Sequence, residues 1–448
     1  MHKTFTKILI TIFFSFVTFS LTENCFANDD GNAQINNKNT AETITAIAVN
    51  KTPSPIDVIP SPPVTRAKAA ILIDANSGKI LAQKDISVKY PPASLTKMMT
   101  LYTISQALKN GTINLDSQVR ISKNAWQTGG SKMFIKVNTN VSVRDLIQGI
   151  IVDSGNDACV AMAEYIAGSV QAFVDIMNTQ AQALGMHDTH FTDCTGLPNK
   201  DLYSTAHDLA LLAQALMRDF PEYYQWYSQK WFAFNGIKQP NRNRLLWRFI
   251  DADGIKTGHT PEAGFCLAAS AKRNNMRLIS IVLGEPSDIA RSDDSVSLLS
   301  YGFRFFQTQL IYQANAEISV PRIWFAKDKY IALSVNHDLY VTATRKQLEN
   351  LQISASMPKR IHAPISKNQT VGQLNIISNE QVISTEPLVA LTDEPEGGLM
   401  RCLFDHAAKF FGGAFGDDSP ITVTLSSVNL DQKTIADNSN NTIQANKI

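Results

Sequence analysis

The sequence predicts an α+β domain, followed by a small all-β sandwich domain and a C-terminal amphipathic helix. Three observations lead to this fold class. A hairpin pattern occupies residues 70–83, helical periodicity follows up to residue 217, and strand-like runs return at residues 265–284. Because the helices lie between two groups of strands, we expect both groups to join one sheet. Short alternating runs then fill residues 320–391, a pattern typical of a small all-β domain.

The first predicted elements are a hairpin and a buried helix. Two apolar runs, residues 70–74 and 79–83, flank a turn-forming stretch at residues 75–78. Residues 95–108 are apolar on several sides, which predicts a helix buried in the interior. Further helices are expected at residues 143–152, 157–166, 170–184 and 208–217.

The remaining elements follow from helix caps and changes of period. Thr205 and Asp208 form a capping-box pattern at the start of the helix at 208–217, with Asp in place of Glu. An antiparallel strand pair is expected from residues 265–271 and 276–284. Strands of the all-β domain are expected at residues 330–333, 339–343 and 371–377.

Length and charge set the broad class of the protein. The chain has 448 residues, 44% of them hydrophobic, enough for about two or three domains with real cores. Its formal net charge is +1, and no basic run interleaved with aromatic residues occurs. The charge pattern of a nucleic-acid-binding protein is therefore absent from the sequence, and we expect no nucleic-acid partner.

Residues 1–27 have the pattern of a secretory signal peptide. Lys3 and Lys7 precede an apolar run at residues 8–21, and small residues lead up to a cleavage point after Ala27. An uncleaved membrane anchor is the alternative, although the run is short for a membrane span. We therefore expect an exported protein.

The C-terminal region contains an amphipathic segment. Arg401, Asp405 and Lys409 fall on one helical face, and apolar residues surround them. Such a helix is expected to lie in a membrane interface, with docking on the protein itself as the alternative. The expected boundaries are a disordered linker at 28–65, the α+β domain at 66–319, the all-β domain at 320–392, the amphipathic helix at 395–416 and a disordered tail at 417–448.

The cysteines and histidines indicate neither a disulfide framework nor a metal site. Four cysteines remain after the leader, and Cys159 and Cys266 lie in apolar runs typical of buried thiols. The sequence contains no His-Glu-x-x-His, and His187 and His190 belong to a polar stretch without further ligands nearby. We expect no metal ion and no other cofactor.

Three short motifs carry chemistry. They are Ser94-Leu-Thr-Lys97, Ser154-Gly-Asn156 and Lys256-Thr257-Gly258, in that order. A second Ser-x-x-Lys begins at Ser356, but the proline inside it disfavours a helix through both residues. The ordered set, and not any single motif, is the strong signal.

The first motif pairs a nucleophile with a base. A serine hydroxyl attacks only when a base takes its proton, and a lysine three residues on lies on the same helical face. Burial or a second cation, such as Lys256, would lower the pKa of Lys97 enough for that task. A helix start at Ser94 would also direct backbone N–H groups at a developing oxyanion. The plain alternative is a capping serine followed by a solvated lysine.

The other two motifs supply polar contacts. The Ser154 hydroxyl can pass a proton to a leaving amine, and Asn156 can bind a substrate amide. Lys256 and Thr257 can attract a carboxylate, while Gly258 leaves room for a peptide along a strand edge. The alternatives are a helix–helix turn with an N-cap for the second motif and an exposed turn for the third.

With their flanking residues, these motifs resemble the low-molecular-mass penicillin-binding proteins that are D-alanyl-D-alanine carboxypeptidases. The likeness covers about residues 66–415 and includes the segments at 239–247 and 301–306. It implies a β-lactamase/transpeptidase-like catalytic domain that removes the terminal D-alanine from peptidoglycan pentapeptide and is acylated by penicillins. It also implies a location on the periplasmic side of the inner membrane, held there by the C-terminal helix.

The resemblance also implies roles for individual residues. Ser94 would be the acylated nucleophile and Lys97 its base, with Ser154, Asn156 and Lys256 completing the proton network. Backbone N–H groups of Ser94 and His259 would form the oxyanion hole. Two arginines, Arg242 and Arg291, would help to hold the substrate carboxylate or its surroundings.

Three other functions stay open at the sequence level. A serine β-lactamase shares the motifs, but no Glu-x-x-Leu-Asn segment lies between Asn156 and Lys256. A D,D-endopeptidase that cuts cross-links would use the same residues. A catalytically inactive cell-wall-binding protein would use the all-β domain instead. The long linker and the polar tail after the amphipathic helix depart from the family pattern.

Overall fold

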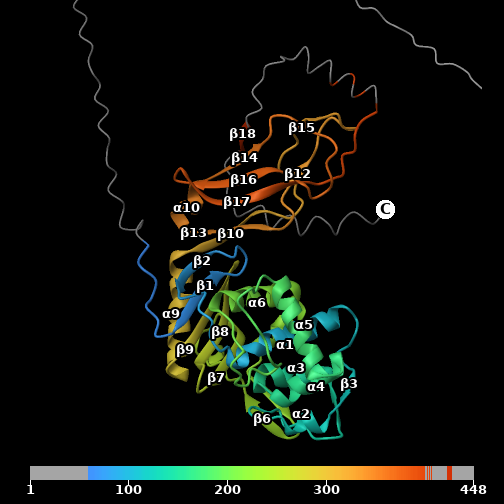
Figure 1. The fold of residues 1–448 in the computed structure, drawn as a ribbon. Coiled ribbons are helices and arrows are strands. Elements are labelled where there is room, and N and C mark those ends of the chain that lie inside the picture. The colour runs from blue at the N-terminus through green and yellow to red at the C-terminus, as the bar shows by residue number, and fades with distance from the viewer. Residues whose placement is uncertain (1–58, 399–400, 402, 404, 406–420, 426–448) are drawn as a thin grey trace, which may run out of the picture. The chain divides into compact units, whose positions relative to one another are not determined.

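The structure is a computed structural model that describes residues 59–398, 401, 403, 405 and 421–425. In Figure 1 the helices α1–α6 and α9 accompany one sheet, and the later strands form a second, all-β domain. The predicted α+β class and the all-β domain are both confirmed.

A five-stranded antiparallel sheet forms the centre of the first domain. Its order is β2-β1-β9-β8-β7, so the first strands of the chain pair with later ones, as predicted. β1 pairs with both β2 and β9. β7 pairs only with β8 in this sheet and is therefore an edge strand. The bounds are β1 Ala69–Asp74, β2 Ile80–Lys84, β7 Ala252–Thr260, β8 Gly264–Arg273 and β9 Met276–Glu285.

Each face of this sheet buries its own apolar core. Side chains alternate between the faces of a strand, so Ile71 and Leu72 of β1 belong to different cores. Ile71 belongs to the large core shared with the helices α1–α6. Leu72 belongs to the core on the side of α9 (Asp288–Phe305). A Cβ at Gly302 of α9 would lie 2.5 Å from Leu278, so this helix approaches the sheet closely.

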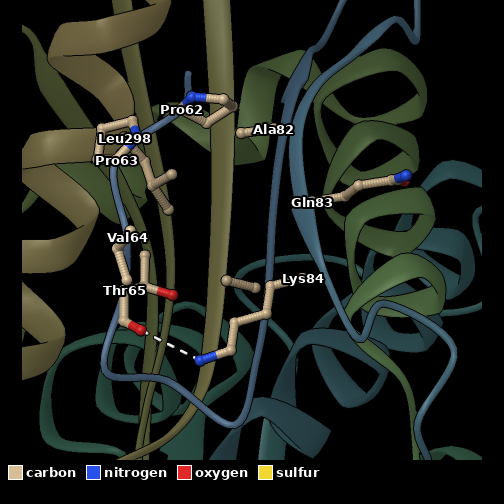
Figure 2. A pocket seen from close by; sticks show the side chains of 9 residues that line it. Pro62, Pro63, Val64, Thr65, Ala82, Gln83, Lys84 and Leu298 are labelled. Carbon is tan, nitrogen blue, oxygen red and sulfur yellow. Dashed lines mark hydrogen bonds between the residues drawn. The ribbon is translucent and has the colours of Figure 1, made fainter.

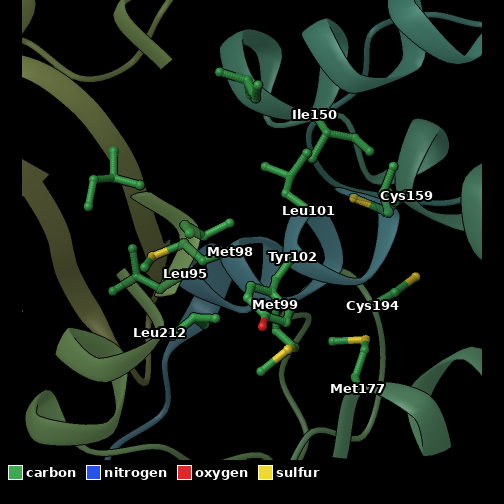
Figure 3. Close-up of a cluster of buried hydrophobic side chains, with 14 of the residues drawn as sticks. Leu95, Met98, Met99, Leu101, Tyr102, Ile150, Cys159, Met177, Cys194 and Leu212 are labelled. Atoms are coloured by element: carbon green, nitrogen blue, oxygen red, sulfur yellow. The ribbon is translucent and has the colours of Figure 1, made fainter. Parts of the chain in front are cut away.

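The helix after the first motif is buried, as predicted. α1 (Lys97–Lys109) follows a 3₁₀ turn, η2 (Ala93–Thr96), and Figure 3 shows its apolar side chains inside the large core. The remaining elements of this domain are α2 Lys123–Gln127, α3 Val143–Gln148, η3 Gly149–Asp153, α4 Asn156–Ala167, α5 Val170–Ala183, α6 Ala206–Asp219, α7 Pro221–Tyr224, η4 Gln225–Ser228 and α8 Leu245–Arg248, with the hairpins β3 Gln118–Arg120/β4 Asn140–Ser142 and β5 Trp231–Phe234/β6 Ile237–Pro240.

Only half of the predicted capping box forms at α6. The Thr205 hydroxyl accepts a 3.0 Å hydrogen bond from the backbone N–H of Asp208, as expected for an N-cap. The Asp208 carboxylate does not return the bond to Thr205. It accepts instead from the backbone of Asp188 and from the hydroxyl of Thr189.

The second domain contains one five-stranded sheet and two short strand pairs. The sheet order is β12-β17-β16-β14-β18, and β10 pairs with β13 while β11 pairs with β15. Strand pairing therefore begins at Gln307, before the predicted boundary between residues 319 and 320. The bounds are β10 Gln307–Tyr312, β11 Ile323–Trp324, β12 Leu333–Ser334, β13 Leu339–Ala343, α10 Arg345–Glu349, β14 Leu351–Met357, β15 Ile361–His362, β16 Thr370–Ser378, β17 Gln381–Ala390 and β18 Ile421–Leu425.

Two segments predicted to be disordered are partly ordered. β18 pairs antiparallel with β14, so the prediction for the tail at 417–448 is wrong for Ile421–Leu425. The linker prediction is wrong for residues 60–65, because Thr65 is buried and its carbonyl accepts a hydrogen bond from Lys84 (Figure 2). A pocket of about 250 Å³ lies there, and none of the predicted site residues lines it.

The predicted amphipathic helix lies mostly outside the described residues. Residues 395–398 are not helical, and Arg401 and Asp405 are. Asp405 is 1% exposed and accepts a hydrogen bond from Arg322, so this charged side chain contacts the all-β domain. Within the described residues, no single helix is long and apolar enough to cross a membrane.

Candidate active site

The three motifs meet in one place and form two serine–lysine pairs. Lys97 Nζ donates a 3.0 Å hydrogen bond to Ser94 Oγ, and Lys256 Nζ donates one of the same length to Ser154 Oγ. The segments come from a helix start, a turn between helices and a sheet edge. Distant parts of the chain therefore bring together the groups that the sequence predicted to act together.

Ser94 lies in the 3₁₀ turn before α1, and its side chain is half-buried. Lys97 begins α1 and is 0% exposed, and its Nζ also donates a 2.5 Å hydrogen bond to the carbonyl of Thr195. Burial is the main cause that lowers the pKa of Lys97, and Arg242 lowers it further. The hydroxyl is thus reachable while its partner amine is kept from water.

The turn at residues 193–196, which contacts this serine–lysine pair, was not predicted from the sequence. Gly196 has a φ of 81°, and a Cβ there would lie 1.9 Å from the carbonyl oxygen of Ala93. The Asp193 carboxylate accepts hydrogen bonds from the backbone of this turn, including a 2.7 Å bond from Gly196. The sequence signal for this close approach of two backbone segments is the glycine at position 196, and a single glycine is weak evidence.

Ser154 stands at a strained turn between helices. The π-helical turn η3 ends at Ser154, whose φ of 59° and ψ of 35° are left-handed. The side chain is 2% exposed. The helix expected at residues 143–152 is not continuous, because α3 ends at Gln148 and the chain goes on as the π-helical turn η3. This turn directs the Ser154 hydroxyl toward Lys256.

Asn156 and Asp157 tie the turn to a neighbouring loop. Asn156 Nδ2 donates a 2.7 Å hydrogen bond to the carbonyl of Gly129, while its buried Oδ1 has no partner among the described residues. The Asp157 carboxylate accepts from three successive backbone N–H groups, those of Met133, Phe134 and Ile135. Asp157 is a residue that the sequence did not single out.

The third motif lies on the edge strand β7. Lys256 and Thr257 are buried, and burial lowers the pKa of Lys256 well below its usual value, with Lys97 and Arg242 adding to the effect. A Cβ at Gly258 would lie 2.9 Å from Pro92 O and 3.2 Å from Ser94 N. Glycine is required here because the strand passes directly beside the backbone of the first motif. His259 is exposed, and its ring packs against Phe265.

The two arginines occupy different positions. Arg242 is exposed and donates a 2.7 Å hydrogen bond to Ser131 Oγ. Arg291 is 6% exposed and donates to the carbonyls of Gly258 and Cys266. Its contacts hold the strand that carries the third motif, so Arg291 belongs to the surroundings of the site.

Further titratable groups lie close by. Asp153 is 2% exposed, and burial raises its pKa to about 7 although Arg242 opposes the shift. Cys159 and Cys266 are buried free thiols, as predicted, and so is Cys194. Cys402 lies outside the described residues. Among the described residues, no group of three or more His, Cys, Asp or Glu side chains could hold a metal ion.

Comparisons with known proteins show the family to which the chain belongs. Residues 56–287 match the D-alanyl-D-alanine carboxypeptidase family, and residues 306–396 match the C-terminal domain of penicillin-binding protein 5. The D-alanyl-D-alanine carboxypeptidase DacA of Escherichia coli strain K12 is 44% identical over 367 residues, 80% of this chain and 91% of that protein.

The solved structures that resemble this chain are also penicillin-binding proteins. Penicillin-binding protein 5 from Haemophilus influenzae has a TM-score of 0.72 and 41% identity, covering 75% of this chain and 100% of that one. Penicillin-binding protein D2 from Listeria monocytogenes, solved in the ampicillin-bound form, has a TM-score of 0.51 and 31% identity, covering 55% and 100%. The chain therefore belongs to the D-alanyl-D-alanine carboxypeptidase family of penicillin-binding proteins.

Proposed function

We propose that this protein is a serine-type D-Ala-D-Ala carboxypeptidase that removes the terminal D-alanine from peptidoglycan pentapeptide. The observation that carries this proposal is the pairing of the half-buried Ser94 hydroxyl with the fully buried amine of Lys97 at 3.0 Å. A nucleophile and a base at this separation, next to a second lysine–serine pair, are suited to acyl transfer.

Acylation begins with a proton transfer from Ser94 to neutral Lys97. The freed oxygen bonds to the carbonyl carbon between the two D-alanines, and that carbonyl oxygen becomes negative. Backbone N–H groups of Ser94 and His259 stabilise this charge. A lysine in a dry site loses its proton more readily than one in water, which is why burial of Lys97 matters.

Departure of the terminal D-alanine needs a proton on its amine. Ser154 Oγ gives that proton and takes up in its place, by way of the hydrogen-bonded Lys256, the proton that Lys97 received from Ser94, so that Lys97 is neutral again. Lys256 and Thr257 attract the substrate carboxylate, and Arg242 adds a positive charge at the edge of the site. Asn156 Oδ1, which has no partner within the described part of the chain, would accept a substrate amide N–H. Water then hydrolyses the ester on Ser94 and releases the shortened peptide.

Acylation by β-lactams follows from the same chemistry. A β-lactam carbonyl would be attacked by Ser94 in place of the peptide, giving an ester that hydrolyses slowly. The ampicillin-bound form of the Listeria relative supports this reading.

We also propose where the protein is located and what each part of the chain does there. Residues 1–27 would direct export, residues 66–319 would be the catalytic domain, and residues 320–392 would form the all-β domain. The segment at 395–416 would hold the enzyme on the periplasmic face of the inner membrane as a peripheral protein. Co-sedimentation of the full chain with anionic lipid vesicles, compared with a chain ending at residue 398, tests this last part.

The decisive test of activity uses the full chain and a diacetyl-Lys-D-Ala-D-Ala peptide. We expect the parent to release D-alanine and Ser94→Ala to release none. Ser356→Ala is the matched control, because Ser356 begins the second Ser-x-x-Lys but lies on strand β14. Release that survives Ser94→Ala would overturn the nucleophile assignment.

A further inference from the structure

Asp153 is a buried carboxyl group beside the site that has no part in the mechanism above. It ends the π-helical turn η3 and directly precedes Ser154. Its side chain is 2% exposed, and its Oδ1 has no hydrogen-bond partner within the described part of the chain. Burying an acceptor without a donor costs free energy. Carboxyl groups buried in this way gather at functional sites, which indicates a role for Asp153 beyond the fold.

The charges around Asp153 decide when it ionises. Burial, aided by Asp157 of α4, raises the pKa of Asp153 to about 7, although Arg242 opposes the shift. The group is therefore neutral below that pH and negative above it. The elements packed against η3 are α3, α4, β5, β6 and η4. Their other ionisable side chains are Arg144, Asp145, Cys159, Glu164, Tyr165, Tyr227 and Lys238.

Arg242 connects this carboxyl group to the site. Among the described residues its guanidinium donates a 2.7 Å hydrogen bond to Ser131 Oγ and forms no ion pair with Asp153. Asp153 acts on it through space instead, because its negative charge opposes the partial burial that lowers the pKa of Arg242. Arg242 in turn lowers the pKa values of Lys97 and Lys256. Its charge therefore reaches the place where a substrate carboxylate would bind.

We propose that Asp153 is a positioning residue that acts through Arg242 and sets how strongly this arginine attracts the substrate carboxylate. When Asp153 is neutral, the charge of Arg242 is uncompensated and attracts the carboxylate toward Lys256 and Thr257. When Asp153 is negative, it cancels part of that charge and weakens binding. Asp153 thus makes substrate affinity depend on pH without touching the substrate. This inference rests on the proposed function, because it concerns substrate binding at the same site.

Steady-state kinetics of D-alanine release test the role of Asp153. We measure kcat and KM of the full chain for the diacetyl-Lys-D-Ala-D-Ala peptide between about pH 5.5 and about pH 9, in the parent and in Asp153→Asn. Asparagine has the shape of the neutral aspartic acid and does not ionise. Asp145→Asn is the matched control. This half-buried carboxylate of α3 accepts from Ser142 and is not among the charges that act on Asp153 or Arg242.

The difference between the parent and Asp153→Asn is expected in KM and only at high pH. The two KM values should agree at about pH 5.5, and the KM of the parent should be about two- to fivefold higher at about pH 9, since one charge acts weakly on an exposed arginine. The ratio of the two kcat values should stay constant across this range, because the charge acts on binding. Asp145→Asn should follow the parent at every pH.

Arg242→Gln gives a second test that does not depend on the folding of Asp153→Asn. Without the arginine, Asp153 has no charge through which to act on the substrate, so the rise of KM with pH seen in the parent should be absent. A rise that persists in Arg242→Gln would contradict the proposal.

Two further outcomes separate this inference from the proposed function. A KM ratio of parent to Asp153→Asn that does not change with pH, or a pH-dependent difference that appears in kcat, would overturn the proposal while leaving the carboxypeptidase activity intact. Absence of D-alanine release by the parent at every pH would instead overturn the proposed function, and this inference with it.

Discussion

The ammonium of Lys256 donates a 3.0 Å hydrogen bond to Ser154 Oγ, and each of these side chains is only 2% exposed. A charged lysine is costly in such a site, so burial lowers the pKa of Lys256, and the nearby Lys97 and Arg242 lower it further. Burial also lowers the pKa of Lys97, and Arg242 lowers it further. Two lysines with lowered pKa values thus face two serine hydroxyls.

Replacing Arg242 by Gln should move the pH dependence of acylation. Removing a neighbouring positive charge favours the protonated form of Lys97, so its pKa rises and the neutral base appears only at higher pH. The acylation rate measured with a fluorescent penicillin should therefore reach half of its plateau at a higher pH than in the parent. Arg244→Gln, which removes a partner of Asp288 instead, is the matched control. An unchanged midpoint in Arg242→Gln would show that this charge does not act on the base.

Gly258→Ala should disable the site without unfolding the protein. The added Cβ would lie 2.9 Å from the Pro92 carbonyl oxygen and 3.2 Å from the Ser94 nitrogen, and backbone atoms cannot rotate away. Displacing Ser94 from the third motif should slow acylation by about ten- to a hundredfold. Gly398→Ala, where a Cβ would meet nothing within 4 Å, should acylate like the parent. A normal acylation rate in Gly258→Ala would mean that the strand can shift freely.

Asp157→Ala should lower stability more than a typical surface change. Its carboxylate accepts three backbone hydrogen bonds from residues 133–135, and the side chain is 1% exposed. Leaving these donors unpaired should cost about 3 kcal/mol in the free energy of unfolding by urea. Asp175→Ala removes an exposed carboxylate that accepts from Gln171 alone among the described side chains, and should cost less than about 0.5 kcal/mol. Equal losses in the two variants would argue against this anchoring role.

The sequence predicted the parts of the site that depend on local patterns. Ser94 and Lys97 are one turn apart, and the buried helix after them follows from apolar residues on several sides. The spacing could not reveal that Ser94 itself lies in a 3₁₀ turn, because that choice depends on the approach of Gly258 and Gly196 from distant segments.

Long-range polar contacts were the features that the sequence could not predict. Asp157 accepts hydrogen bonds from backbone N–H groups more than twenty residues away in the sequence. Any residue except proline at positions 133–135 could supply these donors, so the sequence there does not indicate the contact. The pairing of β18 with β14 likewise joins two segments in which apolar and polar residues alternate, a pattern that does not identify the partner strand. The predicted disorder of this tail came from its composition, which says nothing about a free strand edge.

Glu285, at the end of β9, is a carboxyl group that burial makes hard to ionise. The side chain is 1% exposed. Burial, with the nearby Asp294, raises its pKa from 4.5 to about 8. The pKa of Asp294 is lowered, below its usual 3.8, so that group titrates outside this interval.

Glu285→Gln should therefore change how stability depends on pH. Between pH 4.5 and about 8 the unfolded chain releases the Glu285 proton while the folded protein keeps it. In that interval the parent loses stability as pH rises, because the folded state binds more protons than the unfolded state. Glutamine does not ionise, so the variant should become more stable relative to the parent across the interval and keep a constant advantage above it. Urea unfolding of both proteins from about pH 4 to about pH 9 measures the difference, and the exposed Glu222→Gln is the control. A difference that stays flat through the interval would mean that Glu285 ionises in the folded protein as readily as in the unfolded chain.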